Sequence, residues 1–153
     1  MEVSSKKILS LLARSEVVAV NSPDLETKVG SILVSKKTHS VISEGYNGFV
    51  RGANDEKLPK TRPDKYEYIV HAEENLITNA ARNGVRTDEC FAVQTISPCV
   101  RCARLLYQAG IDTVFYKNWY HGSDRISDLG DLLLVREKIG TFWKMTIKPN
   151  VGE

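Results

Sequence analysis

The chain has 153 residues, a length that suits one domain with a hydrophobic core of its own. Its net charge at pH 7 is only +2, which argues against a nucleic-acid-binding surface, and no apolar run is long enough to cross a membrane. The three cysteines are an odd number and the first ten residues lack the apolar core of a signal peptide, so we expect a cytoplasmic protein rather than a disulfide framework.

The first part of the chain predicts a helix, a β-hairpin and a long loop. Residues 4–20 place apolar side chains at near-helical spacing and end before a turn at residues 21–24. The β-rich runs at residues 29–34 and 41–44 flank a short polar segment, as in a hairpin. Residues 49–65 are polar and contain two prolines, and a loop of this length inside a compact domain is usually functional or disordered.

The second part of the chain alternates between helical and β patterns. We expect helices over residues 66–82, 99–109 and from Ser123 or Asp124 to residue 139, with Gly140 ending the last one, and strands over residues 90–96, 111–116 and 142–147. The predicted fold class is therefore α/β, a three-layer α/β/α domain around a central sheet of about five strands. We expect residues 1–153 to form this single domain.

Two short motifs in the second part carry metal-ligating residue types. They are His71-Ala72-Glu73 and Pro98-Cys99-Val100-Arg101-Cys102, and each falls at the start of an expected helix. One imidazole and two thiolates are a known ligand set for catalytic zinc, which keeps its fourth tetrahedral position open for water. Glu73 follows a ligand by two residues, so it lies near the metal without binding it and is the candidate proton carrier.

The same cysteine pair has two alternative interpretations, half of a structural zinc site or a redox pair. A closed structural site needs a fourth ligand, and Cys90, His39 and His121 are the candidates, none of which has a partner at zinc-finger spacing. Cys90 suits the core, and His39 suits a solvated loop. The spacing therefore favours the catalytic interpretation.

Two further segments are candidates for substrate contacts. Gly45-Tyr46-Asn47-Gly48 directly follows the second strand, where glycines let the backbone turn sharply and approach a ligand. Beside a zinc pocket, the amide of Asn47 is a natural contact for a sugar hydroxyl, although the segment alone is also an ordinary turn. Tyr120 follows a strand next to the second zinc motif, so its ring either faces the pocket or packs in the aromatic cluster around it.

Several segments between residues 24 and 124 resemble the deoxycytidylate (dCMP) deaminases of the cytidine deaminase superfamily. The pattern His-x-Glu followed by Pro-Cys-x-x-Cys is the signature of zinc nucleobase deaminases. The Gly-Tyr-Asn-Gly turn, the long loop after it and the Lys65-Tyr66 lead-in to His71 point to the dCMP branch. The resemblance also includes Thr27-Lys28-Val29-Gly30, Asn54-Asp55, Gln108-Ala109-Gly110-Ile111, Tyr120-His121 and Ser123-Asp124.

This resemblance implies zinc-dependent hydrolysis of dCMP to dUMP and ammonia in pyrimidine deoxynucleotide metabolism. It implies an oligomer, often a hexamer in the family, that dCTP activates and dTTP inhibits, with no nucleic-acid or membrane partner. The implied roles are Zn²⁺ on His71, Cys99 and Cys102, Glu73 as proton shuttle, Asn47 near the deoxyribose, backbone of Ala72 and Ser97 at the base edge, Tyr120 in the substrate site, and Gly48, Asn54 and Asp55 near the effector.

The chain also departs from the family pattern. It has Asn21 where many members have a basic residue, Val50 where proline is common and Lys60 where tryptophan is common. Candidate phosphate donors are Lys28, Arg51, Lys60 and Arg62. The alternatives in function are a bifunctional dCMP/dCTP deaminase or another cytidine-nucleotide deaminase, and a non-enzymatic nucleotide-binding subunit with structural zinc.

Overall fold

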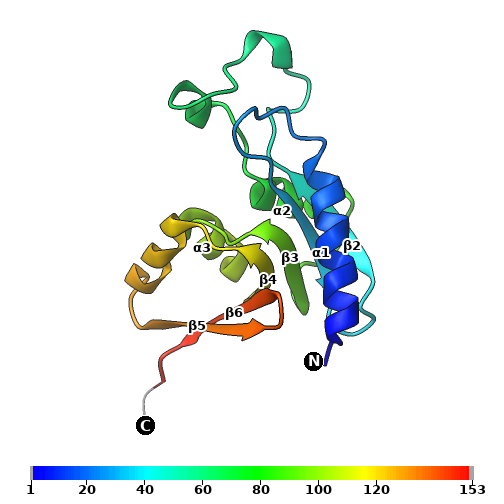
Figure 1. The fold of residues 1–153 in the computed structure, drawn as a ribbon, viewed down its shortest axis with the longest axis vertical. Helices are drawn as coiled ribbons and strands as arrows, with labels where there is room; N and C mark the ends of the chain where they lie inside the picture. The colour runs from blue at the N-terminus through cyan, green and yellow to red at the C-terminus, as the bar shows by residue number, and fades with distance from the viewer. Residues whose placement is uncertain (1, 152–153) are drawn as a thin grey trace.

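A computed structural model describes residues 2–151 and shows one sheet with helices on both faces (Figure 1). The helices are α1 (Ser5–Ala19), α2 (Ala72–Arg82) and α3 (Val100–Gln108). The strands are β1 (Gly30–Ser35), β2 (Val41–Tyr46), β3 (Cys90–Ile96), β4 (Thr113–Asn118), β5 (Leu132–Ile139) and β6 (Phe142–Pro149). The short 3₁₀ helices are η1 (Asp55–Lys57), η2 (Asp64–Glu67) and η3 (His121–Asp128).

The sheet has the strand order β2-β1-β3-β4-β6-β5. Only the central pair β3 and β4 is parallel, and helix α3 makes the crossover between them. The remaining neighbours pair antiparallel. Because β3 and β4 are parallel neighbours, their C-terminal ends lie at the same edge of the sheet, and the segments that follow the two strands lie close together there.

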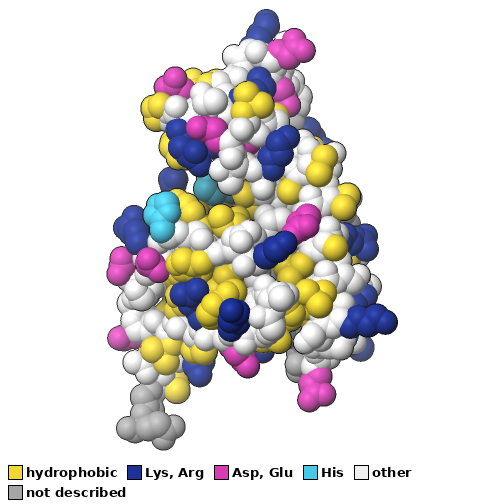
Figure 2. All heavy atoms as spheres, in the orientation of Figure 1, with side chains coloured by type: hydrophobic (Ala, Val, Ile, Leu, Met, Phe, Trp, Pro, Cys, Tyr) yellow, Lys and Arg dark blue, Asp and Glu magenta, His cyan; other side chains and the backbone are white. Residues whose placement is uncertain are grey.

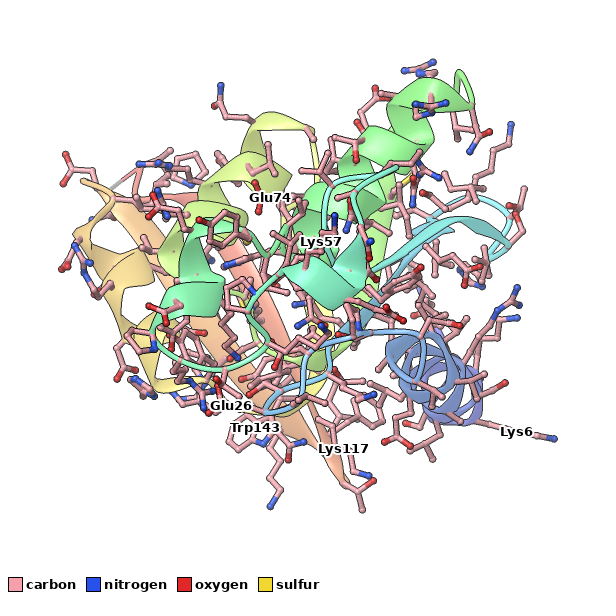
Figure 3. All side chains as sticks on the ribbon, turned by 90° about the horizontal axis from the view of Figure 1, so that it is seen from above. Lys6, Glu26, Lys57, Glu74, Lys117 and Trp143 are labelled. Carbon is pink, nitrogen blue, oxygen red and sulfur yellow. The ribbon has the colours of Figure 1, made fainter. Side chains whose placement is uncertain are left out.

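Two hydrophobic cores lie on opposite faces of the sheet. Helix α1 packs Ile8 and Leu11 against Ile32, Phe91 and other residues of one face. Helices α2 and α3 pack on the other face, where Leu76 and Leu106 belong to the second core. In Figure 3 the side chain of Lys6 points away from the body on the outer side of α1. The predicted three-layer α/β/α arrangement is therefore confirmed.

The predicted helix from Ser123 or Asp124 to residue 139 is wrong. Only the short η3 forms, and Gly130 and Asp131 then adopt positive φ angles of 60° and 28° that no α-helix continues through. Residues 132–139 form β5 instead, paired with β6 along its whole length. Gly140, predicted to end the helix, lies in the two-residue turn of this hairpin with φ 62°. The described sheet consequently has six strands rather than about five.

The predicted helix over residues 66–82 begins later than expected. Val70 forms an isolated antiparallel bridge with Gly48, so the chain is extended just before α2. The preceding segment contains η1 and η2 and projects beyond the sheet at the top of Figure 1.

Within residues 2–151, none of the helices combines the length and apolarity needed to span a bilayer. On the face drawn in Figure 2, basic and acidic side chains are intermixed.

Candidate active site

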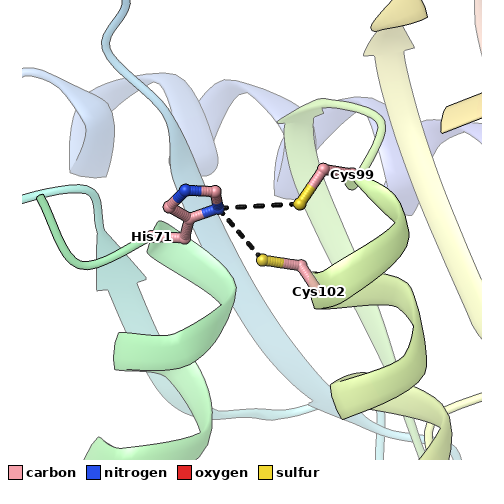
Figure 4. Close-up of side chains that lie close together, drawn as sticks. All are labelled: His71, Cys99 and Cys102. Carbon is pink, nitrogen blue, oxygen red and sulfur yellow. Dashed lines mark hydrogen bonds between the residues drawn. The ribbon is translucent and has the colours of Figure 1, made fainter. Parts of the chain in front are cut away.

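The two sequence motifs meet at the N-terminal ends of α2 and α3. His71 is the N-cap of α2, Cys99 is the N-cap of α3, and Cys102 lies in the first turn of α3. His71 Nδ1 lies 3.2 Å from Cys102 Sγ and 3.7 Å from Cys99 Sγ (Figure 4). All three candidate ligand atoms lie within 4.8 Å of one another.

Local packing explains why the two helix ends converge. A Cβ on Gly45 would lie 2.5 Å from the Leu76 nitrogen and 2.6 Å from the Ala72 oxygen, so only glycine lets α2 rest directly on β2. The Glu74 carboxylate accepts a hydrogen bond of 2.9 Å from the His71 N–H and closes the first turn of α2. Pro98 follows β3 and leads into α3.

The three donors fit a zinc ion. Tetrahedral bonds of about 2.0–2.1 Å to nitrogen and about 2.3 Å to sulfur place neighbouring nitrogen and sulfur ligands about 3.5 Å apart. The two nitrogen–sulfur separations bracket that value. All three cysteines are free, and Cys90 is buried in the core away from this group, as predicted. The described residues offer no other group of three such ligands.

The electrostatics of the group favour thiolate at Cys99, whereas the hydrogen bond to Cys99 raises the pKa of Cys102 and keeps it a thiol. A hydrogen bond from the Cys102 thiol holds the pKa of Cys99 at about 4, against the opposing effect of burial. The interaction with Cys99 in turn raises the pKa of His71, while burial opposes that rise. Thiolate is the form in which cysteine binds a metal.

Glu73 is buried beside these ligands, with 4% of its surface exposed. Its Oε2 accepts a hydrogen bond of 3.1 Å from Gln94 Nε2, which extends from the middle of the sheet. Burial raises the pKa of the Glu73 carboxyl above its ordinary value, and its hydrogen bonds only partly offset this. A raised pKa suits a carboxyl group that must both take and give a proton near neutral pH.

A cavity of about 140 Å³ opens onto His71, Glu73 and Cys99. A cavity of about 150 Å³ accepts a benzene-sized ring, so the enclosed space matches one six-membered ring rather than a whole nucleotide. The exposed side chains of Arg62 and Tyr66 stand among its lining residues. Further lining residues are Asp24, Thr27, Val29, Asn47, Lys65, Ile69, Ala72, Ile96, Ser97 and Tyr120.

Asn47 lines the cavity, but its amide is already occupied by protein partners. Its Oδ1 accepts from the Val29 N–H at 2.8 Å, and its Nδ2 donates to the Thr27 oxygen at 2.8 Å and to Asp24 Oδ2 at 3.3 Å. The side chain therefore fixes the segment between α1 and β1 as one wall of the cavity.

The other three predicted substrate residues also line the cavity. Ser97 Oγ accepts from the Tyr120 N–H at 2.7 Å, which ties the segment after β4 to the end of β3. The Ser97 N–H donates to the Asn118 oxygen at 2.9 Å, so its carbonyl is the backbone group left to contact a base. Ala72 lies between the metal ligand and Glu73 in the first turn of α2.

Sequence reasoning missed a buried ion pair in the cavity wall. Lys65 Nζ lies 2.8 Å and 3.0 Å from the two carboxylate oxygens of Asp24, and both side chains are almost fully buried. The sequence indicated Lys65 only as part of the family motif before His71 and did not predict its burial, because no local pattern distinguishes a buried lysine from a solvated one. Gln94 was missed as well, although a polar residue inside the apolar run of β3 was a usable signal.

The candidate phosphate donors separate in space. Arg62 lines the cavity and donates to Thr27 Oγ1 at 2.9 Å and to the Tyr66 hydroxyl at 2.8 Å. Lys28 Nζ donates to the Ser22 oxygen and Lys60 Nζ to the Asp55 oxygen, and neither lines this cavity. Arg51 lines a second cavity.

The second cavity has a volume of about 630 Å³ and lies over the predicted effector region. Gly48 and Asp55 are among its lining residues, together with Arg51 and Arg82. Asn54 is not, and its side chain instead caps η1 by accepting from the Glu56 N–H at 3.1 Å.

Comparison with known proteins relates this geometry to one family. The family profile described as the cytidine and deoxycytidylate deaminase zinc-binding region matches residues 5–118. A deoxycytidylate deaminase of Pongo abelii is 36% identical over 113 residues, which cover 69% of this chain and 62% of that protein. The chain thus spans less than two thirds of this relative. A deoxycytidylate deaminase of Mus musculus is 34% identical over 137 residues, covering 85% of this chain and 74% of that protein.

The fold is also similar to that of a solved dCMP deaminase structure. The dCMP deaminase of cyanophage S-TIM5, solved in complex with dCMP and dUMP, superposes with a TM-score of 0.69 at 26% identity. The superposition covers 84% of this chain and 93% of that one. Cytidine deaminase from Burkholderia pseudomallei shares only the fold, with a TM-score of 0.51 at 16% identity over 97% of this chain and 94% of that chain.

Proposed function

This chain belongs to the cytidine and deoxycytidylate deaminase family, and on that premise we propose that it hydrolyses dCMP to dUMP and ammonia. The observation that carries the proposal is a buried carboxyl group, an imidazole and one thiol lining a cavity of ring size, with a second thiol next to them. The relatives named deoxycytidylate deaminase support dCMP as the substrate. The zinc ligands would be His71, Cys99 and Cys102.

The proposed mechanism assigns proton transfer to Glu73. When bound, zinc supplies Lewis acidity that lowers the pKa of a water molecule from about 15.7 to about 7. Glu73 takes one proton from the attacking water and delivers it to the ring nitrogen, where it stays, and then carries the second proton from the added hydroxyl group to the leaving amine. The water oxygen becomes the new carbonyl oxygen of dUMP, and the amine leaves as ammonia.

The remaining cavity residues position the nucleotide. The backbone of Ala72 and the carbonyl of Ser97 face the base edge, with Tyr120 closing the cavity beside them. Asn47 shapes the wall next to the deoxyribose. Because the enclosed volume holds only the ring, the sugar and phosphate lie toward the mouth, where Arg62 is the cationic donor for the 5′-phosphate.

The proposal is tested by measuring ammonia release from dCMP, dCTP, deoxycytidine and a cytidine-containing RNA hairpin. We expect dCMP to be the preferred substrate, and absence of dCMP turnover in zinc-loaded protein would refute the proposal. Glu73→Gln is expected to lower kcat by about 10²–10⁴-fold with zinc content unchanged. Glu16→Gln, on α1 across the sheet, is the matched control and should keep full activity.

The assay also separates the alternatives. Comparable turnover of dCMP and dCTP would identify a bifunctional enzyme. A non-enzymatic subunit with structural zinc would turn over none of the nucleotides, and its zinc site would be indifferent to Glu73. The buried position of Glu73 beside the ligands supports the enzymatic interpretation, because a closed site has no use for this carboxyl group.

We further propose that the second cavity binds a regulatory nucleotide. Its volume lies within the usual range for small-molecule sites, and Arg51 and Arg82 provide positive charge for phosphates. Activation by dCTP, inhibition by dTTP and a homo-oligomeric assembly are the expected behaviour. Hyperbolic dCMP kinetics that neither dCTP nor dTTP changes would contradict this regulatory proposal.

A further inference from the structure

Gln94 is a fully buried polar residue in the middle of the sheet. It lies in β3, between neighbours Val93 and Thr95, and faces the layer formed by α2 and α3. Burying an amide costs free energy unless its polar atoms find partners. Gln94 has three: Oε1 accepts from Ser31 Oγ at 2.9 Å, and Nε2 donates to Glu73 Oε2 at 3.1 Å and to the Ile96 oxygen at 2.7 Å.

The chemistry of these partners fixes the orientation of the amide. The Ile96 carbonyl and an ionised Glu73 only accept hydrogen bonds, so the NH₂ end of Gln94 must face them. Ser31 is the partner that can donate to the remaining oxygen. Ser31 is directly opposite Gln94 in the antiparallel pair of β1 and β3, and it is also fully buried.

We propose that Gln94, held by Ser31, is a positioning residue that sets the orientation of the Glu73 carboxylate for proton transfer. Its hydrogen bond occupies one carboxylate oxygen and leaves the other to exchange protons with water and substrate. The inference rests on the proposed deaminase function for its kinetic consequence. The structural link between the two side chains is tested without any substrate.

The first experiment replaces the amide by an apolar side chain of similar length. Gln94→Met removes the donor to Glu73, and we expect kcat for dCMP to fall about ten- to hundredfold while KM changes by less than about twofold. Zinc content should match the wild type. A wild-type kcat in this variant, or a loss confined to KM, would overturn the proposal.

The second experiment tests the role of Ser31. Ser31→Ala frees the amide oxygen of Gln94, so we expect a smaller loss of kcat in the same direction. In the double variant with Gln94→Met, the Ser31 substitution should add nothing further to the loss, because both changes act through one chain of hydrogen bonds. Multiplicative losses in the double variant would mean that Ser31 does not act through Gln94.

Val93→Ala provides the matched control for general damage to β3. Val93 is equally buried but faces the layer of α1, away from Glu73. We expect this variant to unfold at a lower temperature while its folded form keeps the wild-type kcat. A kcat loss in Val93→Ala as large as that in Gln94→Met would assign both effects to the fold and overturn the positioning role.

A measurement without substrate separates this inference from the proposed function. In ¹⁵N-labelled protein the Gln94 side-chain amide protons should exchange slowly, and Glu73→Ala should speed their exchange. If the wild-type protein deaminates no nucleotide, the proposed function fails, and this exchange measurement alone decides the Gln94–Glu73 link. Exchange that is unchanged by Glu73→Ala would refute the link even in an active enzyme.

Discussion

At the scale of single residues, the cavity wall depends on a carboxylate whose burial no local sequence pattern indicates. Asp24 accepts hydrogen bonds from Lys65 and from the backbone N–H groups of Glu26 and Thr27. Burial alone would raise the pKa of Asp24, but these partners together hold the pKa below its ordinary value of 3.8. Both ionised side chains thus stabilise the wall only as a pair.

The sign of this pKa shift predicts how stability depends on pH. A carboxyl group whose pKa is lower in the folded state stabilises the fold fully above its unfolded-state pKa, about 3.9, and loses that contribution as pH falls through the folded-state value. Asp24→Asn should reduce the free energy of unfolding by about 3–5 kcal/mol at pH 7, because Lys65 loses its buried partner. Urea titrations should show the gap to the wild type narrowing below about pH 4.

A double variant tests whether the loss of stability in Asp24→Asn comes from the unpaired charge of Lys65. Combining Asp24→Asn with Lys65→Met removes both charges and should recover part of the lost stability at pH 7. A gap between wild type and Asp24→Asn that stays constant from pH 7 to pH 3 would contradict the assigned pKa shift.

At the scale of elements, the site depends on the close approach of α2 to β2. His71 and Glu73 take their positions from the first turn of α2, and that turn lies against the backbone of Gly45. The hairpin of β5 and β6 lies at the other end of the sheet order and contributes no residue to the lining of the cavity. The chemistry is therefore coupled to the packing of α2 rather than to the C-terminal strands.

Gly45→Ala tests this coupling. The added methyl group would meet backbone atoms of α2, which cannot rotate away, so we expect a loss of about 1–3 kcal/mol in the free energy of unfolding. We also expect weaker zinc retention, because the first turn of α2 must shift. Gly48→Ala is the control for stability, since its added Cβ would meet only side-chain atoms at 3.4 Å or more. Equal unfolding energies for both variants would refute the argument.

At the scale of the whole molecule, two cores support the fold independently of the metal. Each face of the sheet buries its own cluster of apolar side chains, and the candidate zinc ligands lie at helix ends beyond them. A domain of this size does not need a metal to supply its folding free energy. Zinc therefore belongs to the chemistry of the site.

Metal removal should separate activity from folding. After treatment with a strong chelator, we expect dCMP deamination to be lost while the far-UV circular dichroism spectrum stays that of a folded protein. The unfolding temperature should fall modestly, because an ion that binds only the folded state stabilises it by mass action. Restored zinc should restore activity. Unfolding of the chain on chelation would instead favour a structural metal.

Much of the candidate site could be predicted from the sequence because its chemistry is encoded locally. The spacing within His71-Ala72-Glu73 and within Cys99 to Cys102 places each group on one helix start, where capping and charge preferences act over a single turn. The hairpin of β1 and β2 and the helix α1 were predicted for the same reason, since periodicity over a few residues decides them.

Only the tertiary structure decided the features that depend on distant partners. The run Leu132–Ile139 has a pattern that suits a helix or a strand, and its pairing with β6 made it a strand. Lys65 is buried because Asp24, far away in the sequence, neutralises it. Gln94 reaches Glu73 because strand pairing and helix packing bring together segments that share no local pattern. The sequence by itself determined the reactive groups, and long-range packing determined which neighbours hold them in place.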